Sequence, residues 1–106
     1  MPKYLFQASY TLDGVKGLLK HGGSKRRAAI EETIKGLGGK LEAVYFAFGE
    51  DDVFVIVDAP DNVSIAAVSL AVTASGAANL KTTVLLTPEE MDQAAKKTVR
   101  YRPPGA

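Results

Sequence analysis

Two strand–helix–strand units joined by a hairpin constrain the fold of this 106-residue chain more than any other feature. Residues 3–10 alternate apolar and polar side chains with the period of two that is typical of a strand. Residues 40–48 and 53–59 are rich in Val, Phe and Ile, and the short polar turn at 49–52 between them predicts an antiparallel hairpin. Residues 80–87 supply a fourth strand.

Two helices are expected between these strands, and a third follows the last one. Residues 25–37 carry one apolar stripe and follow Ser24, whose hydroxyl can accept from the free amides of a first helical turn. A short helical run precedes Ser24 and is broken at Gly22-Gly23, because glycine tolerates the positive φ that ends a helix. A second helix spans about residues 62–74, and a capping box opens a third over 88–97.

Segments in this order fold most simply into an α+β, ferredoxin-like βαββαβ sandwich. Its four-stranded antiparallel sheet carries two helices on one face. The helix over 88–97 and an extended tail, which contains Pro103-Pro104, are additions to that core. A chain of this length makes one domain, and we expect it to span residues 1–106.

Helices can cover only one face of such a sheet, yet the second and third strands have apolar side chains on both faces. With strict alternation, the second strand places Leu41, Ala43, Tyr45 and Ala47 on one side and Val44, Phe46 and Phe48 on the other. An exposed apolar patch of this kind marks an interface, so we expect a homo-oligomer, a dimer at least. The alternative is a monomer whose C-terminal segment folds over the bare face.

Composition excludes several classes of function. The apolar fraction of 46% and the charged fraction of 24% are those of a globular domain. A net charge of +1 gives no field to hold nucleic acid or an anionic membrane, so neither is expected as a partner. Without cysteine there is no thiolate nucleophile and no Cys-ligated metal, and we expect no metal and no cofactor. The N-terminus has no apolar signal segment, which predicts a cytoplasmic protein.

The stretch between Asp61 and Lys81 has no charged residue and approaches the length of a membrane span. Seven polar or glycine positions interrupt it: Asn62, Ser64, Ser69, Thr73, Ser75, Gly76 and Asn79. We therefore predict a buried helix of a protein outside the membrane. Since this helix is apolar nearly all round, burial on more than one side is expected.

Four segments together resemble the GYD-domain family: KYLFQASYTLDGVKGLLK, GGSKRRAAIEE, LGGKLEAVYFAFGEDDVFVIVDAPD and the YRPPG tail. The resemblance covers essentially the whole chain. It implies a ferredoxin-like fold of the dimeric α/β barrel type, in small bacterial proteins of unestablished function. The turn of this chain contains Gly49-Glu50-Asp51-Asp52, without the tyrosine that the family's name implies. The resemblance supplies no substrate and no catalytic residue.

Polar residues within or beside the strands are the first candidates for a ligand site in a cleft beside the sheet. They are Gln7, Ser9, Tyr10, Tyr45, Asp58 and Lys81, with Thr83 a further polar position. A buried Lys or Asp with a shifted pKa can serve as an acid or base. The alternative is structural: Asp58 caps a strand end, and Lys81 extends outward from an edge.

A second candidate is an anion site at the glycine-rich start of the 25–37 helix. Ser24, Lys25, Arg26 and Arg27 follow two glycines, whose exposed amides favour negative charge. The alternative is a solvated basic helix end or a salt bridge between subunits. His21, the single histidine, is either a metal or haem ligand or a cap of the preceding helix terminus.

The tail places Tyr101 between Arg100 and Arg102 and either holds a partner subunit, covers a pocket or frays. Three hypotheses of function follow. The first is a homo-oligomeric protein that binds a small, partly apolar, anionic ligand in a sheet–helix cleft. The second is a cofactor-independent enzyme, like monooxygenases of this fold, that uses Tyr10, Tyr45 or Asp58. The third is a structural or regulatory module for protein partners.

Overall fold

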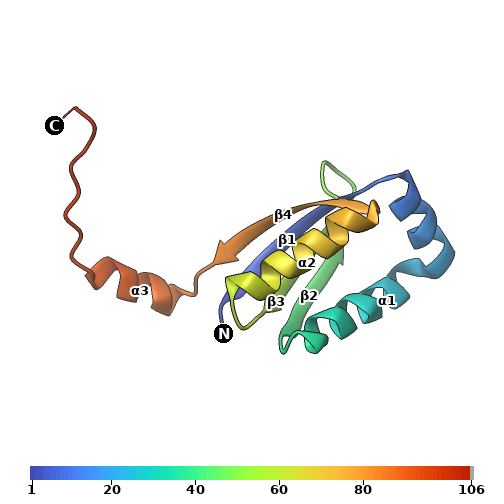
Figure 1. The fold of residues 1–106 in the computed structure, drawn as a ribbon, viewed down its shortest axis with the longest axis horizontal. Helices are drawn as coiled ribbons and strands as arrows, with labels where there is room; N and C mark the ends of the chain where they lie inside the picture. Colours follow the sequence, from blue (N-terminus) through green and yellow to red (C-terminus); the bar gives the residue numbers. More distant parts are fainter. Residues whose placement is uncertain (106) are drawn as a thin grey trace.

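The computed structural model describes residues 1–105 and has an α+β architecture with three helices and one four-stranded sheet (Figure 1). The strand order is β2-β3-β1-β4, and every neighbouring pair is antiparallel, which is compatible with a ferredoxin-like fold. The elements in chain order are β1 (Lys3–Tyr10), α1 (Leu12–Gly36), β2 (Lys40–Phe46), β3 (Val53–Asp58), α2 (Asn62–Ser75), β4 (Ala78–Leu85) and α3 (Pro88–Lys96).

Helix α1 combines the two helical runs that the sequence separates. It is sharply kinked at Gly22, whose φ of 78° and ψ of 170° are non-helical. Its N-cap is Thr11, whose side chain accepts from the amide of Gly14. The expected N-cap at Ser24 is wrong, because Gly22 is the residue that leaves the helical conformation and the Ser24 hydroxyl bonds to nothing in residues 1–105.

The core lies between the helices and one face of the sheet. Strand β1 buries Tyr4, Phe6 and Ala8 there, and β3 buries Val53, Val55 and Val57. Helix α1 packs mainly on β2 and contributes Ile34, whereas α2 packs on β4 and contributes Ile65 and Val68. The helices therefore cover opposite edges of the sheet, and the two central strands form the floor between them (Figure 1).

Strand β2 departs from strict alternation at one position. An irregularity between Leu41 and Ala43 pairs Leu41 with Val57 and Ala43 with Ile56. Leu41 is consequently buried on the helix side, the same face as the partly buried Val44 and the exposed Phe46. The expectation that it shares a face with Ala43 and Tyr45 is wrong.

The second face of the sheet, here called the open face, has no helix against it (Figure 1). Its apolar side chains remain partly or largely exposed: Leu5, Ala43, Tyr45, Phe54, Ile56 and Leu85. Helix α2 also exposes apolar groups on its outer side, where Val63 and Leu70 lie, so in the single chain it is not buried on more than one side.

Helix α3 and the tail project away from the sheet (Figure 1). The capping box is present as expected: Thr87 accepts from the amide of Glu90, and Glu90 accepts from the amide of Thr87. Every residue from Glu89 to Gly105 is exposed. The alternative in which the C-terminal segment covers the open face of its own chain is therefore wrong. Within residues 1–105, no helix is both long and apolar enough to cross a membrane.

Candidate functional site

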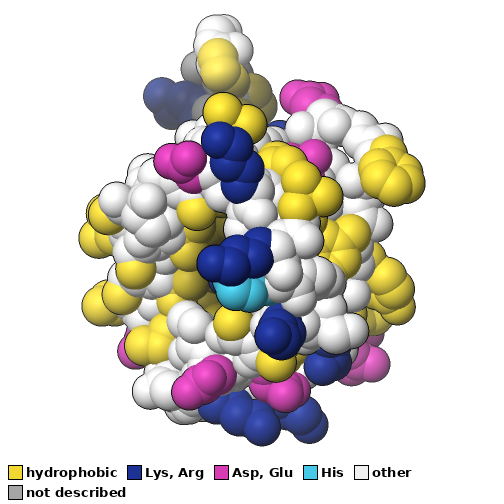
Figure 2. Space-filling model, turned by 90° about the vertical axis from the view of Figure 1, so that its right-hand side faces the viewer, with side chains coloured by type: hydrophobic (Ala, Val, Ile, Leu, Met, Phe, Trp, Pro, Cys, Tyr) yellow, Lys and Arg dark blue, Asp and Glu magenta, His cyan; other side chains and the backbone are white. Residues whose placement is uncertain are grey.

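A cleft opens between α1 and α2, above the two central strands. Its outer part has a volume of about 580 Å³ and its inner part about 90 Å³. The two parts adjoin, since they share six lining residues: Tyr10, Arg26, Thr33, Val68, Val72 and Ala78. Figure 2 shows a hollow lined by hydrophobic side chains with Lys, Arg and histidine side chains nearby.

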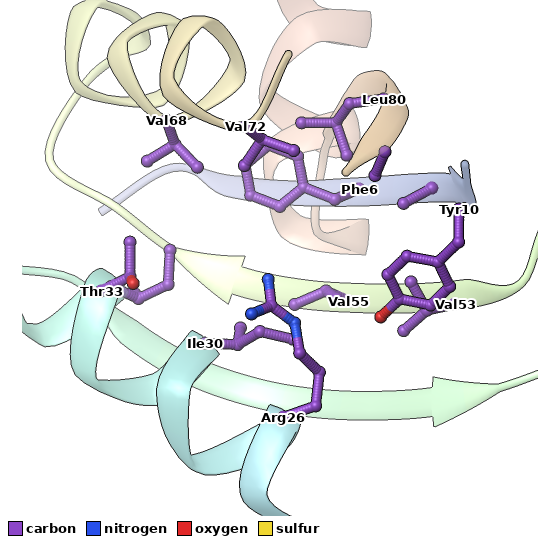
Figure 3. A pocket seen from close by; sticks show the side chains of 13 residues that line it. Phe6, Tyr10, Arg26, Ile30, Thr33, Val53, Val55, Val68, Val72 and Leu80 are labelled. Carbon is purple, nitrogen blue, oxygen red and sulfur yellow. The ribbon is translucent and has the colours of Figure 1, made fainter. Parts of the chain in front are cut away.

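The floor and walls of this cleft are apolar. Phe6, Val53 and Val55 rise from the central strands, Ile30 comes from α1, and Val72 comes from α2 (Figure 3). Along each strand, Phe6, Val53 and Val55 alternate with residues of the open face. The period of two of a β-strand therefore places all three on the cleft side of the sheet. Space remains above it because each helix packs over its own edge of the sheet.

Arg26 is the main charged group of the cleft. Figure 3 shows its guanidinium reaching from α1 over the apolar floor toward α2. Within residues 1–105 it forms no ion pair, and the hydroxyl of Tyr10 forms no hydrogen bond. Thr33 is different, since its hydroxyl donates to the carbonyl of Ala29 in the same helix. Lys25 and His21 add basic groups to the outer part.

Tyr10 is held in place by the backbone around it. Its amide donates to Oδ2 of Asp52 at 2.8 Å. In the next residue, Thr11, the amide donates to the carbonyl oxygen of Ala77 at 3.0 Å, and the hydroxyl donates to the carbonyl oxygen of Gly76 at 2.7 Å. Gly14 lies so close to Ala77 that a Cβ there would clash. These contacts fix the start of α1 against the α2–β4 turn and close one end of the cleft.

The open face has a polar cluster centred on Asp51. The carboxylate accepts from Nε2 of Gln7 at 3.3 Å and from the hydroxyl of Ser9 at 3.2 Å, and Nζ of Lys81 lies 3.2 Å away. The Ser9 hydroxyl also lies 3.0 Å from the carbonyl of Glu50. Asp51 is 8% exposed although it belongs to a turn. The cluster therefore ties the β2–β3 turn to β1 and β4.

Comparison with known proteins gives one family match. The sequence model of the GYD domain matches residues 4–95, which includes most of α3 and the whole sheet except Lys3. The chain belongs to the GYD-domain family. No match was found among curated proteins or among solved structures.

The predicted strand residues of this GYD domain divide between the two faces of the sheet. Gln7, Ser9 and Lys81 come together at Asp51 on the open face, whereas Tyr10 alone lines the cleft. Asp58 also lies on the open face, at the far end of the sheet, and Tyr45 is 70% exposed on the edge strand. Tyr10, Tyr45 and Asp58 thus do not share one site. Thr83 is exposed on the open face of β4.

Asp58 is engaged by Lys3. Nζ of Lys3 lies 3.0 Å from Oδ1 of Asp58 and 3.0 Å from Oε2 of Glu42. The hydrogen bond with Glu42, and then that with Asp58, raises the pKa of Lys3 above its ordinary value of 10.5. In the GYD domain, Asp58 therefore shares Lys3 with Glu42 in a network of ion pairs at the end of β3.

The predicted anion site divides in the same way. Lys25 and Arg26 line the cleft of the GYD domain, while Ser24 and Arg27 do not. His21 lines its outer part. No group of three or more His, Asp and Glu side chains in residues 1–105 is arranged to hold a metal ion, so no companions for His21 as a ligand are present there.

Sequence reasoning missed Asp51 and the apolar lining of the cleft. The signal for Asp51 was available in part, because Gln7 and Lys81 are directly paired in β1 and β4 and each is polar. The apolar lining had no separate signal, since core and cleft residues alternate identically along a strand.

Proposed function

We propose that this GYD domain is a homo-oligomeric small-molecule-binding protein. Its ligand has an apolar body and one anionic group, and it binds in the cleft between α1 and α2. The observation that carries the proposal is the unpaired Arg26 guanidinium directed over an apolar floor (Figure 3).

The apolar part of the ligand follows from the lining. The outer cleft, at about 580 Å³, lies within the range of about 300–1,000 Å³ that small-molecule sites occupy. Such sites are mostly apolar and contain few polar groups, as here. A ligand that covers the half-buried Ile30, Val72 and Leu80 would remove their remaining apolar surface from water.

The anionic part follows from the charges at the cleft. Arg26, Lys25 and His21 supply basic nitrogens, whereas Asp13 is the single acidic residue lining the space. A guanidinium presents a planar pair of N–H donors that matches a carboxylate. The Tyr10 hydroxyl supplies a further donor. A monocarboxylate with an apolar chain or ring fits this combination.

The apolar open face supports the homo-oligomer half of the proposal. The open face combines Leu5, Phe54 and Ile56 with the exposed Tyr45, which a partner sheet would cover. Packing of two such sheets across a twofold axis gives the dimeric α/β barrel arrangement. The cleft lies on the opposite face and stays open in that dimer.

Calorimetric titration with octanoate and with octanol tests the ligand class. Octanoate should bind saturably and more tightly than octanol. Arg26→Gln should weaken octanoate binding by about tenfold or more and leave octanol binding unchanged, because a charged hydrogen bond is removed. Arg27→Gln, one residue outside the cleft, is the matched control and should bind octanoate normally.

An absence of saturable octanoate binding, or equal losses in Arg26→Gln and Arg27→Gln, would contradict the proposal. Native mass spectrometry of the protein from its own host is the second test. A retained small acid supports it, whereas a stably bound second protein without a ligand favours the protein-interaction hypothesis.

A further inference from the structure

The C-terminal arm, residues 86–105, carries an apolar surface that its own chain leaves bare. In α3, Met91, Ala94 and Ala95 lie on one side of the helix at spacings of three and four residues. Leu86, Val99 and Tyr101 are exposed beside this helix. Helices of nine residues are marginal in water on their own. Stable α3 therefore needs a surface to pack against.

A complementary surface lies at the corner formed by the end of β2 and the β2–β3 turn. Tyr45 and Phe48 are among its most exposed aromatic side chains, at 70% and 109%. Glu50 is exposed next to them, and Asp51 and Asp52 follow. We call Tyr45, Phe48 and Glu50 the turn patch.

Charge supports the same pairing. After Asp92 the arm has four cations and no acid: Lys96, Lys97, Arg100 and Arg102. The turn has three carboxylates, of which Asp51 is paired with Lys81. The cleft presents Lys25, Arg26 and His21, so it repels a basic tail where the turn patch attracts it.

Within one chain these two features lie at diagonally opposite corners of the sheet. The arm leaves β4 at Leu85, which pairs with Lys3 at one end of β1. The turn follows β2 at the other edge, where Phe46 pairs with Val53 near Ala8 at the other end. A twofold axis that lies between two open faces and runs perpendicular to this diagonal brings each arm corner over the other copy's turn corner, and both contacts form at once.

We propose that the arm of one copy binds the turn patch of a second copy of this chain, with the Met91 stripe on the aromatic side chains and the basic tail beside Glu50. Leu85 on the open face leads directly into Leu86 of the arm, so the contact continues the seam between the two sheets. This inference rests on the homo-oligomer of the proposed function, and it adds which segment is exchanged and where it binds.

Photo-crosslinking between isotopically distinct copies tests it. The full chain with p-benzoylphenylalanine in place of Met91 is unfolded, mixed with ¹⁵N-labelled chain and refolded. After irradiation, mass spectrometry should find light–heavy crosslinks at residues 45–50. The control places the same group at Glu89, on the other side of α3, and should give several-fold fewer crosslinks there. Crosslinks within one chain only, crosslinks elsewhere, or none at all would overturn the inference.

Light scattering on two variants gives an independent measurement. Met91→Asp should weaken self-association by about tenfold or more, because an apolar side chain that the proposed contact buries becomes charged. Gln93→Asp, on the opposite side of α3, should associate normally. Equal association of both variants would overturn the arm contact.

Light scattering of the native chain also distinguishes a failure of the arm exchange from a failure of the homo-oligomer on which it rests. A native chain that scatters as an 11.2 kDa monomer contradicts the homo-oligomer itself. A native oligomer without light–heavy crosslinks at the turn patch contradicts the arm exchange alone.

Discussion

Nζ of Lys81 lies 3.2 Å from Oδ2 of Asp51, and the pair joins strand β4 to the turn between β2 and β3. Gln7 and Ser9 of β1 donate to the same carboxylate. These contacts link the β2–β3 turn to β4 across β1, the strand that lies between β3 and β4. A polar cluster on the open face thus holds the sheet together where apolar packing is incomplete.

We expect Asp51→Ala to lower the free energy of unfolding by about 1–3 kcal/mol, because the donors of Gln7, Ser9 and Lys81 lose a charged acceptor. Lys81→Ala should cost less than about 1 kcal/mol, since its side chain is largely exposed. Urea denaturation measures both. Glu50→Ala should stay within about 0.5 kcal/mol of the native value, and similar losses in all three variants would contradict this assignment.

Tyr4→Phe removes a partly buried hydrogen bond at the start of α2. The Tyr4 hydroxyl donates to Oδ1 of Asn62 at 2.5 Å, and Tyr4 is 1% exposed. We expect a loss of about 1 kcal/mol in the free energy of unfolding. Tyr45→Phe, at an exposed tyrosine, should change it by less than about 0.5 kcal/mol. Equal stability of the two variants would show that the bond contributes nothing.

Two glycines of α1 should respond oppositely to alanine. A Cβ at Gly14 would clash with the carbonyl of Ala77 and the ring of Tyr10, so Gly14→Ala should destabilise by about 1–3 kcal/mol. Gly17 has open space around it, and Gly17→Ala should stabilise by about 0.5–1 kcal/mol through helix propensity. Thermal unfolding followed by circular dichroism distinguishes them. If Gly14→Ala unfolds at the same temperature as the native protein, the α2–β4 turn must move to make room for the added Cβ.

Acid should weaken α3 through its capping box. The amide of Thr87 donates to the Glu90 carboxylate and lowers the pKa of Glu90 below its ordinary value of 4.5. Because the folded pKa is the lower one, the stabilisation is present above pH 4.5 and is lost as pH falls through the folded pKa. The ¹³Cα shifts of residues 88–96 should therefore move toward coil values in acid.

Glu90→Gln supplies the matched control for that titration. Its amide oxygen can still accept from Thr87, but it does not ionise in this range. The acid-dependent change in ¹³Cα shifts should shrink in this variant. An unchanged titration would assign the transition to another group.

Local patterns predicted the elements well where the cause was local. The period of two in residues 3–10 defines β1, and the capping box at Thr87 starts α3 at Pro88. The predicted break at Gly22-Gly23 is a kink within α1. Strand β4 begins at Ala78, two residues before the predicted start, since its register is set by pairing with β1 up to Tyr10.

The candidate site was less predictable. Arg26 and Tyr10 lie sixteen positions apart, on α1 and β1, and only the packing of the helices brings both to one cleft. The bulge after Leu41 is a further example. Strict alternation places Leu41 beside Tyr45, but pairing with Val57 turns it into the core.

The two strand–helix–strand units joined by a hairpin leave one sheet face bare, which is a consequence of composition and order alone. Two helices cannot cover both sides of four strands that are apolar on both sides, whatever the details of packing. The tertiary structure decided which polar residues meet, because register and helix position depend on contacts between distant segments. It also decided that the arm leaves the sheet uncovered, since α3 extends away from its own chain (Figure 1).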